Sequence, residues 1–276
     1  MRSLVFNIFL AVSAASPIID HSRPTVRVKN GTLLGQTANA VDSFPGIPYA
    51  QPPVDELRLK PPQPITAPYG RLNLPMTPAF CPQQNLTYFN LTGVPAETQA
   101  LIGPISAPLP GAPSEDCLTL DVQRPAGTGK DDKLPVLFWI HGGGWQVGAP
   151  SDASLILQKS KDLDTPIIYV GIRYRLGAYG WLAGKEVQDE GVSNLGLKDQ
   201  RLAMQWVAEN IAAFGGDPSQ VTIWVSFSFA GRRCCKLANC RILRVKAPVL
   251  FQYTTILRSI TATTNTMARL FSAEQS

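Results

Sequence analysis

The stretch LPVLFWIHGGGW at residues 134–145 most constrains what this chain can fold into. Val136 to Ile140 is an unbroken apolar run, which is typical of a strand buried on both faces of a sheet. His141 and three consecutive glycines, Gly142 to Gly144, follow at once. Glycine tolerates positive φ and leaves backbone N–H groups uncovered, so such a strand end can stabilise a developing oxyanion. The alternative is a glycine-rich turn without chemical consequence, and the neighbouring sequence must decide.

The surrounding sequence alternates between strands and crossover segments. Short apolar runs predict strands at 118–122, 166–174 and 221–224, with a crossover segment at 151–161. From Gly196 the apolar spacing becomes helical, which Ser193 or Asn194 can cap and Gly215, Gly216 and Pro218 can end. One helix face carries Ala203, Val207, Asn210, Ile211 and Phe214. This alternation predicts an α/β domain with a parallel sheet.

The residues before this region favour extended and irregular structure. Residues 25–36 predict a hairpin around Asn30-Gly31. Four prolines between 45 and 53 argue against a central strand at 41–50 and favour a rigid wrap over the core. Residues 61–113 are rich in proline and lack periodicity, so we expect a long ordered loop region there.

The N-terminus predicts a secreted protein. Arg2, the apolar run Leu4–Val12 and the small residues after it have the pattern of a signal peptide over residues 1–15. That run is too short to cross a bilayer, and no later segment predicts a transmembrane helix. A buried N-terminal helix is the alternative, although no cap or amphipathic face supports it. In a secreted chain the three sequons, at Asn30, Asn85 and Asn90, predict glycosylation sites.

The net charge of +5 is unevenly distributed. Residues 225–276, here the basic tail, hold eight Lys or Arg and one acidic residue, so they carry +7 and residues 1–224 carry −2. The main body is therefore not expected to bind nucleic acid. Proline and glycine almost vanish from the basic tail, while three of the five cysteines lie in it. Body and tail look like different kinds of sequence.

Five blocks of the body, in order and spacing, resemble the type-B carboxylesterases and lipases, a family that includes cholinesterases and fungal lipases. The blocks are FPGIPYAQPP at 44–53, SEDCLTLDV at 114–122, HGGGWQVG at 141–148, YRLGAYGWL at 174–182 and the long block at 193–224. The resemblance covers residues 25–224. It implies the N-terminal part of an α/β-hydrolase fold. The family also implies a secreted serine hydrolase, which acts on carboxylic esters without a metal or organic cofactor.

The same resemblance implies roles for particular residues. Gly143 and Gly144 are similar to the loop donors of the oxyanion hole, and Trp145 is a candidate pocket residue or a core filler. Cys81 and Cys117 correspond to the family's first disulfide, and a cysteine pair in a secreted chain is more often bridged than free. The expected substrate of an intact member is a small-molecule or lipid ester.

Several charged residues in these blocks are expected to be structural. Arg58 and Glu115 are predicted to form a buried arginine–carboxylate network rather than to act in catalysis. Asp199, Arg201 and Asp217 are predicted to cap or form ion pairs around the helix.

The resemblance breaks after Trp224. The family's strand runs into a G-x-S-x-G nucleophile elbow, whereas this chain continues VSFSFAG, with Val225 and Phe227 in place of the expected glycine and serine. Ser226 and Ser228 lie outside that frame. The two histidines, His21 and His141, both precede the break, and the basic tail holds one carboxylate side chain, that of Glu274. We therefore expect nucleophile, acid and base to be absent, and the fold to be truncated after the strand at 221–224.

The leading interpretation is the N-terminal part of a secreted esterase or lipase that is inactive as written. Two alternatives remain: a non-catalytic binding or adhesion protein like the cholinesterase-like ones, and a basic-tailed interaction protein that uses residues 232–246 on an anionic partner. The abrupt change at Val225 also suggests that the basic tail arises from intron read-through or a frameshift.

Overall fold

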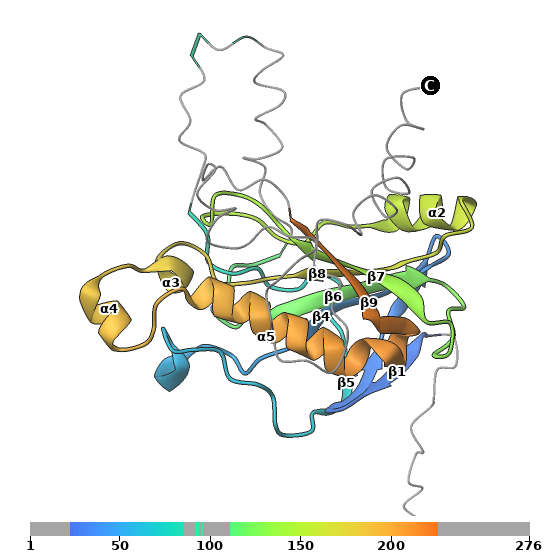
Figure 1. Cartoon of the computed structure of the whole chain (residues 1–276), viewed down its shortest axis with the longest axis horizontal. Coiled ribbons are helices and arrows are strands. Elements are labelled where there is room, and N and C mark those ends of the chain that lie inside the picture. Colours follow the sequence, from blue (N-terminus) through green and yellow to red (C-terminus); the bar gives the residue numbers. More distant parts are fainter. Residues whose placement is uncertain (1–22, 85–91, 94, 96–110, 226–276) are drawn as a thin grey trace, which may run out of the picture.

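The computed structural model describes residues 23–84, 92–93, 95 and 111–225 (Figure 1). The predicted signal peptide, the sequons at Asn85 and Asn90, and the tail residues from 226 onward lie outside the described residues. Within the described part, no helix is long and apolar enough to cross a membrane.

A six-stranded sheet forms the centre of the described structure. Its strand order is β3-β4-β6-β8-β7-β9. The bounds are β3 Gln36–Ala38, β4 Val41–Pro48, β6 Thr119–Pro125, β7 Leu134–Ile140, β8 Ile168–Ile172 and β9 Gly216–Val225.

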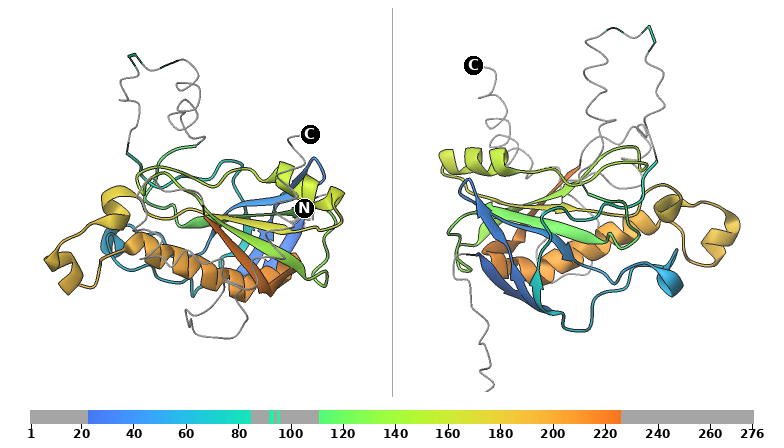
Figure 2. Two further views of the ribbon diagram at one scale, coloured as in Figure 1. Left: turned by 45° about the horizontal axis from the view of Figure 1, so that its top comes forward. Right: turned by 180° about the vertical axis from the view of Figure 1, so that it is seen from behind.

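Two helices lie on opposite faces of this sheet, α5 (Leu195–Asn210) on one and α2 (Ser154–Asp162) on the other (Figures 1 and 2). Successive residues of β7 alternate between them: Val136 and Phe138 belong to the larger core on the α5 side, and Leu137 to a smaller cluster with Leu157 of α2. The prediction that this strand is buried on both faces is therefore confirmed. The predicted helix face is also confirmed, because Ala203, Val207, Asn210, Ile211 and Phe214 are all at most 4% exposed.

A second, three-stranded sheet packs beside the first. It contains β1 Thr25–Val28, β2 Gly31–Leu34 and β5 Gly70–Asn73 in the order β1-β2-β5. The predicted hairpin forms, but Val28 pairs with Gly31, so the turn residues are Lys29 and Asn30 rather than Asn30 and Gly31. β5 lies inside the stretch expected to be loop and pairs in parallel with β2, so that expectation was wrong there.

The proline-rich stretch at 41–50 forms a strand inside the sheet, which corrects the prediction. β4 pairs with β6 along its length, but with β3 only over Val41–Ser43. The register shifts between Phe44 and Ile47, where the backbone N–H of Gly46 bonds to Asp121 instead of to the ladder. The prolines are tolerated because Pro45 lies in this bulge and β3 does not extend beside Pro48.

The sheet is mixed rather than parallel throughout. β7 is parallel to both β8 and β9, whereas β3, β4, β6 and β8 pair antiparallel. The alternation of strands and crossovers holds only from β7 onward, since β6 reaches β7 by a short turn instead of a helix. The prediction of a parallel sheet is therefore confirmed only for the second half of the described chain.

The ends of α5 differ in part from the prediction. Asn194 is the first flanking residue, but it has a left-handed conformation (φ 53°) and its side chain makes no capping hydrogen bond. The helix continues as η2 (Ile211–Phe214) and ends at Gly215 with φ 86°, as the glycine pair predicted. Pro218 lies inside β9. The remaining short helices are η1 Asp55–Leu57, α3 Gly177–Trp181 and α4 Lys185–Asp189.

Candidate functional site

The site predicted from the sequence begins where β7 and β9 end side by side. In their parallel register Ile140 pairs with Val225. The chain therefore leaves β7 into the glycines at 142–144 next to the point where it leaves β9. This is the carboxyl edge of the parallel strands, where α/β proteins place their ligand sites.

The glycine loop, here residues 141–148, turns sharply after Gly142. The N–H groups of Gln146 and Val147 both donate to the carbonyl of Gly143, at 3.1 and 3.2 Å. Gly143 has φ 112°, and a Cβ atom there would lie 2.0 Å from the Val147 carbonyl oxygen, so only glycine fits. Gly144 has φ 64° and open space where its Cβ would be. The turn thus requires glycine at position 143, whereas position 144 has a positive φ but open space beside it.

Trp145 supports this loop with its ring and its backbone. Its indole stacks on that of Trp181 from α3, with ring centroids 4.4 Å apart, and its carbonyl accepts from the N–H of Gly177 at 2.7 Å. Trp145 itself has φ 64°, a conformation that costs a non-glycine residue about 1 kcal/mol or more. The Trp145 side chain is half-buried, and its stack on Trp181 supports the middle of the glycine loop.

His141 is the buried start of the loop. Its ring stacks on Tyr174 at 4.4 Å, and the Tyr174 hydroxyl donates to the His141 carbonyl at 2.7 Å. Nδ1 lies 2.9 Å from the Gly142 carbonyl, which only accepts, so Nδ1 carries the proton. Burial lowers the pKa of His141 to about 4. The imidazole is therefore neutral at pH 7 and structural.

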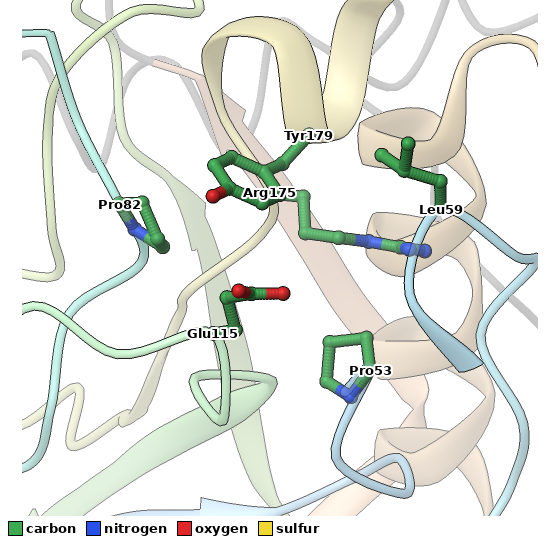
Figure 3. Close-up of a pocket in the computed structure, with 6 residues that line it drawn as sticks. All are labelled: Pro53, Leu59, Pro82, Glu115, Arg175 and Tyr179. Atoms are coloured by element: carbon green, nitrogen blue, oxygen red, sulfur yellow. The ribbon is translucent and has the colours of Figure 1, made fainter. Parts of the chain in front are cut away.

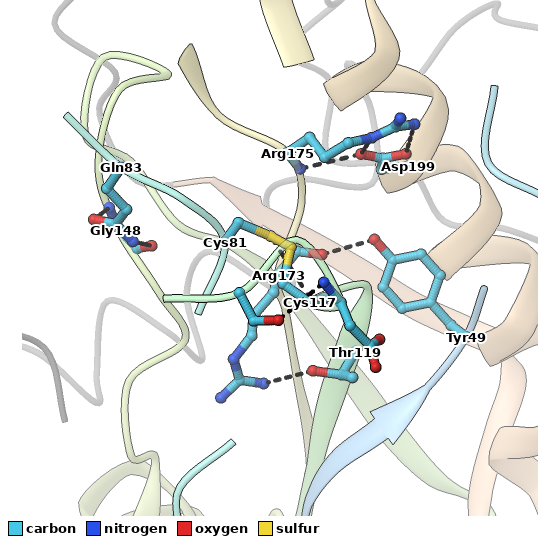
Figure 4. The surroundings of a disulfide bond; sticks show 11 residues. Tyr49, Cys81, Gln83, Cys117, Thr119, Gly148, Arg173, Arg175 and Asp199 are labelled. Atoms are coloured by element: carbon cyan, nitrogen blue, oxygen red, sulfur yellow. Dashed lines mark hydrogen bonds and ion pairs between the residues drawn. A yellow bond between two sulfur atoms is a disulfide. The ribbon is translucent and has the colours of Figure 1, made fainter. Parts of the chain in front are cut away.

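The far end of the loop is held by one side chain, that of Gln83 (Figure 4). Its Nε2 donates to the Gly148 carbonyl at 2.6 Å, and its Oε1 accepts from the Gly148 N–H at 3.0 Å. The backbone N–H of Gln84 also donates to the carbonyl of Gln146, at 3.0 Å. Two adjacent residues thus join the segment after Cys81 to the loop.

Cys81 and Cys117 form a disulfide in the structure, with an S–S distance of 2.02 Å. Both residues are buried. Cys117 lies two residues before β6 begins at Thr119, so the bridge attaches the 81–84 segment to the central sheet. The pair implied by the family resemblance is the one that the structure joins.

Two of the ion pairs among the described residues involve charged residues that the sequence singled out, and they differ in burial. Arg175 and Asp199 are buried and joined by two side-chain bonds, with the Arg175 N–H donating to the same carboxylate. Arg58 and Glu115 also pair, at 2.6 Å, but their side chains are 49% and 23% exposed. The predicted buried network of Arg58 and Glu115 was therefore wrong. Of these two pairs, the one at α5 is buried, where an ion pair of Asp199 was expected.

A shallow surface hollow, in which about 210 Å³ of space includes open solvent, lies beside the disulfide segment (Figure 3). Figure 3 shows Glu115 and Tyr179 at its rim, with Arg175 between α3 and the 53–59 segment. The lining residues are Pro53, Leu59, Pro82, Glu115, Arg175 and Tyr179. Both charged residues already have ion-pair partners, so the pocket offers no unpaired charge to a ligand.

Other predicted residues have local roles or lie outside the described part. Nδ2 of Asn30 donates to the Ile65 carbonyl at 3.0 Å, so the nitrogen that a glycan would modify is engaged. Asp217 accepts from Ser219 and Gln220 within β9 and not at the helix. Arg201 is an exposed residue of α5. The positions His21, Ser226, Phe227, Ser228 and Glu274 lie outside the described residues.

Sequence reasoning did not find the residues that hold the loop. Gln83 has no motif around it, and its one signal is its place two residues after a bridged cysteine. Tyr174 and Trp181 lie in the YRLGAYGWL block, which was noted for its pattern and not for these contacts.

The mixed sheet, the flanking helices and the glycine loop after β7 define the α/β-hydrolase fold, and solved structures agree. An esterase titled "thermophylic PNB esterase" is 35% identical with a TM-score of 0.60, covering 73% of this chain and 38% of its own. EstA of Aspergillus niger is 30% identical with a TM-score of 0.61, covering 74% of this chain and 36% of its own.

The sequence matches the carboxylesterase family over residues 22–231, and the chain belongs to that family. A secreted triacylglycerol lipase of Gibberella zeae is 44% identical over 220 residues, which are 77% of this chain and 37% of that lipase. Secreted lipase 1 of Botryotinia fuckeliana is 45% identical over 218 residues, which are 76% of this chain and 36% of that lipase. This chain thus spans well under half the length of these relatives. The family match runs seven residues beyond Trp224, where we placed the end of the resemblance.

Proposed function

We propose that this chain provides the oxyanion-binding half of a secreted serine hydrolase of carboxylic esters. The observation that carries the proposal is the glycine loop at the end of β7, with Gly143 and Gly144 both at positive φ. Among the described residues, no hydrogen bond is made by the backbone N–H of either glycine. Secretion is supported by the signal-peptide pattern and by relatives named as secreted lipases.

The chemistry follows from where charge develops in acyl transfer. Attack on an ester carbonyl places negative charge on its oxygen, and preorganised N–H donors stabilise that charge without reorganising. Two glycine N–H groups in a fixed turn suit this task, because no side chain blocks the approach of the ester. Loss of one such donor typically lowers kcat by about 100- to 1000-fold.

The nucleophile must come from residues that follow β9. Because Ile140 pairs with Val225, a serine on a turn after β9 would lie beside the glycine loop. The sequence there, VSFSFAG, has no G-x-S-x-G frame, so we propose that the chain as written does not hydrolyse esters.

A p-nitrophenyl ester assay and labelling with a fluorophosphonate test this proposal on the purified chain. We expect no turnover above background and no labelled serine. Ser228→Ala and His141→Ala are the controls. Turnover that Ser228→Ala abolishes would show that the break after Trp224 was misinterpreted.

The family activity itself is tested by a chimera. Residues 22–224 of this chain, joined to the remaining part of the Botryotinia lipase, are expected to restore ester hydrolysis. In that chimera Gly143→Ala, whose Cβ would lie 2.0 Å from the Val147 carbonyl oxygen, displaces the donors and should lower kcat far more than KM. Gly144→Ala, whose Cβ would enter open space, is the matched control. An active chimera whose kcat is unchanged by Gly143→Ala would contradict the oxyanion role.

We also propose that the basic tail arises from intron read-through or a frameshift near the codon of Val225. Its support is the simultaneous change in charge and in glycine, proline and cysteine usage. Sequencing the spliced transcript across this junction is the direct test, and we expect Gly-x-Ser-x-Gly after Trp224. A transcript that reads through Val225 in every spliced form would refute this explanation.

A further inference from the structure

We propose that Gln83 is a positioning residue for the oxyanion donors, and that the Cys81–Cys117 disulfide fixes the backbone from which it acts. This inference rests on the function proposed for the glycine loop. It assigns a role to a side chain that no motif marks, 65 residues away in sequence from the loop that it holds.

The first step is the geometry of the contact. The Gln83 carboxamide donates to the Gly148 carbonyl and accepts from the Gly148 N–H, at 2.6 and 3.0 Å. It therefore pairs with both backbone groups of one residue, as a neighbouring strand would. Only a side-chain amide carries a donor and an acceptor so spaced without a charge. Figure 4 shows the carboxamide of Gln83 directed at Gly148.

The second step is how Gly148 is coupled to the donors. A Cβ atom on Gly148 would lie 2.2 Å from Nδ1 of His141, so its backbone is packed on the ring that starts the loop. A Cβ atom on Gly143 would likewise lie 2.0 Å from the carbonyl oxygen of Val147. Residues 147 and 148 thus lie directly against His141 and Gly143. A displacement of Gly148 therefore also displaces Gly143 and Gly144, because atoms in close-packed contact cannot move independently.

The third step is the support behind Gln83. Cys81 is bridged to Cys117 at the start of β6, and the Phe80 carbonyl accepts from the N–H of Ser114 at 2.9 Å. The segment that carries Gln83 is thereby attached to the central sheet two residues before the contact. A glutamine on an unattached segment would have to be ordered each time the contact formed, which costs conformational entropy.

The other supports of the loop act at different places. Tyr174 and Trp181 hold its start and its middle through His141 and Trp145. Gln83 is the described side chain that bonds to its last residue, so its removal should loosen the loop from that end and leave the sheet intact.

The test uses the full chain labelled with ¹⁵N-glycine and reads amide exchange and chemical shift residue by residue. Gln83→Met keeps the length of the side chain but removes donor and acceptor. Gln84→Met is the matched control, because the neighbouring exposed residue contacts the loop through its backbone N–H only. Gly171, in the middle of β8, reports on the fold as a whole.

We expect Gln83→Met to speed exchange at Gly148 by about fivefold or more, because its N–H loses its acceptor. Gly143 and Gly144, whose N–H groups have no such bond to lose, should report a displaced loop through changed amide chemical shifts. The Gly148 amide proton should shift upfield, and Gly171 should not change. Gln84→Met should leave all four resonances as in the native chain. If Gln83→Met does not fold, Gln83→Asn replaces it, since the shorter amide cannot reach both groups of Gly148.

The disulfide is tested with the double variant Cys81→Ala/Cys117→Ala, which should speed exchange at Gly148 in the same direction. Amide shifts of Gly143 and Gly144 left unchanged by Gln83→Met would overturn the proposal. Acceleration of exchange at Gly171 equal to that at Gly148 would also overturn it, because Gln83 would then be a residue of general stability. These measurements need no ester turnover. A failed chimera therefore counts against the proposed function and not against this coupling.

Discussion

Acidification should destabilise this protein through one buried histidine, His141. Burial holds the pKa of His141 at about 4 in the folded chain, against an ordinary value of 6.5. The folded state therefore favours the neutral ring, which stacks on Tyr174 and donates Nδ1–H to Gly142. Below pH 6.5 the unfolded chain takes up a proton that the folded chain does not, so stability is complete above pH 6.5 and falls as the pH drops toward 4.

The size of the effect follows from the two pKa values. Each unit of difference corresponds to about 1.4 kcal/mol, so the full separation amounts to about 3.5 kcal/mol of unfolding free energy. The range from pH 7.5 to 4.5 covers most of the interval between the two pKa values. Over this range His141 alone should lower the free energy of unfolding by about 2.5 kcal/mol. This is a large fraction of the stability of an ordinary domain.

The comparison variant is His141→Asn, whose amide can still donate to the Gly142 carbonyl but does not titrate. Urea unfolding followed by tryptophan fluorescence, at intervals from pH 7.5 to 4.5, gives the two stability profiles. The variant is less stable at neutral pH because it loses the stack on Tyr174, but its profile should be flatter by about 2.5 kcal/mol over this range. Carboxyl groups contribute equally to both profiles and cancel. Parallel profiles would refute the assignment of a buried, neutral His141.

Three further predictions concern the loop, the buried ion pair and the disulfide. Gly143→Ala should disrupt the glycine loop because its Cβ would lie 2.0 Å from a carbonyl oxygen. Gly144→Ala should cost only about 1 kcal/mol of backbone strain. Urea unfolding compares the two variants, and equal losses of stability would contradict the geometry. Asp199→Asn should lose about 3–5 kcal/mol by leaving its arginine partner buried without a counter-charge, and a loss under 1 kcal/mol in the same assay would show that water reaches the pair. Peptide mapping of the secreted, non-reduced chain should find Cys81 linked to Cys117, and two free thiols would exclude the bridge.

Sequence patterns predicted the parts of the fold that depend on burial along one element. The apolar run of β7 and the helical face of α5 are such cases, because a buried face repeats with the period of its own element. The strand β4 was missed for the opposite reason. Pro45 argues against a ladder position, and the sequence does not reveal that a bulge removes Pro45 from the ladder. Pairing in β5 depends on β2, nearly 40 residues earlier, and leaves no local pattern.

The same distinction applies to the candidate site. Gly143 and Gly144 could be selected from the sequence because consecutive glycines after a buried strand are rare and have a conformational reason. Gln83 could not, because a side-chain contact to the backbone of Gly148 imposes no periodicity on either segment. Arg58 and Glu115 were paired correctly but placed in the wrong environment. A pair of opposite charges in a sequence carries no information about its depth below the surface.

Among the residues that the structure describes, the supports of the glycine loop come from segments that precede Val225. Tyr174 holds its start, Trp181 its middle and Gln83 its end, and each belongs to a segment packed on β6, β7, β8 or α5. The donors are therefore fixed in place before any residue after β9 is considered. A nucleophile, in contrast, would have to be positioned by the turn after Val225, which is paired with Ile140 at the mouth of the loop. Oxyanion binding and nucleophilic attack thus depend on separable parts of the chain, and variants of Gln83 should affect the first without altering β9.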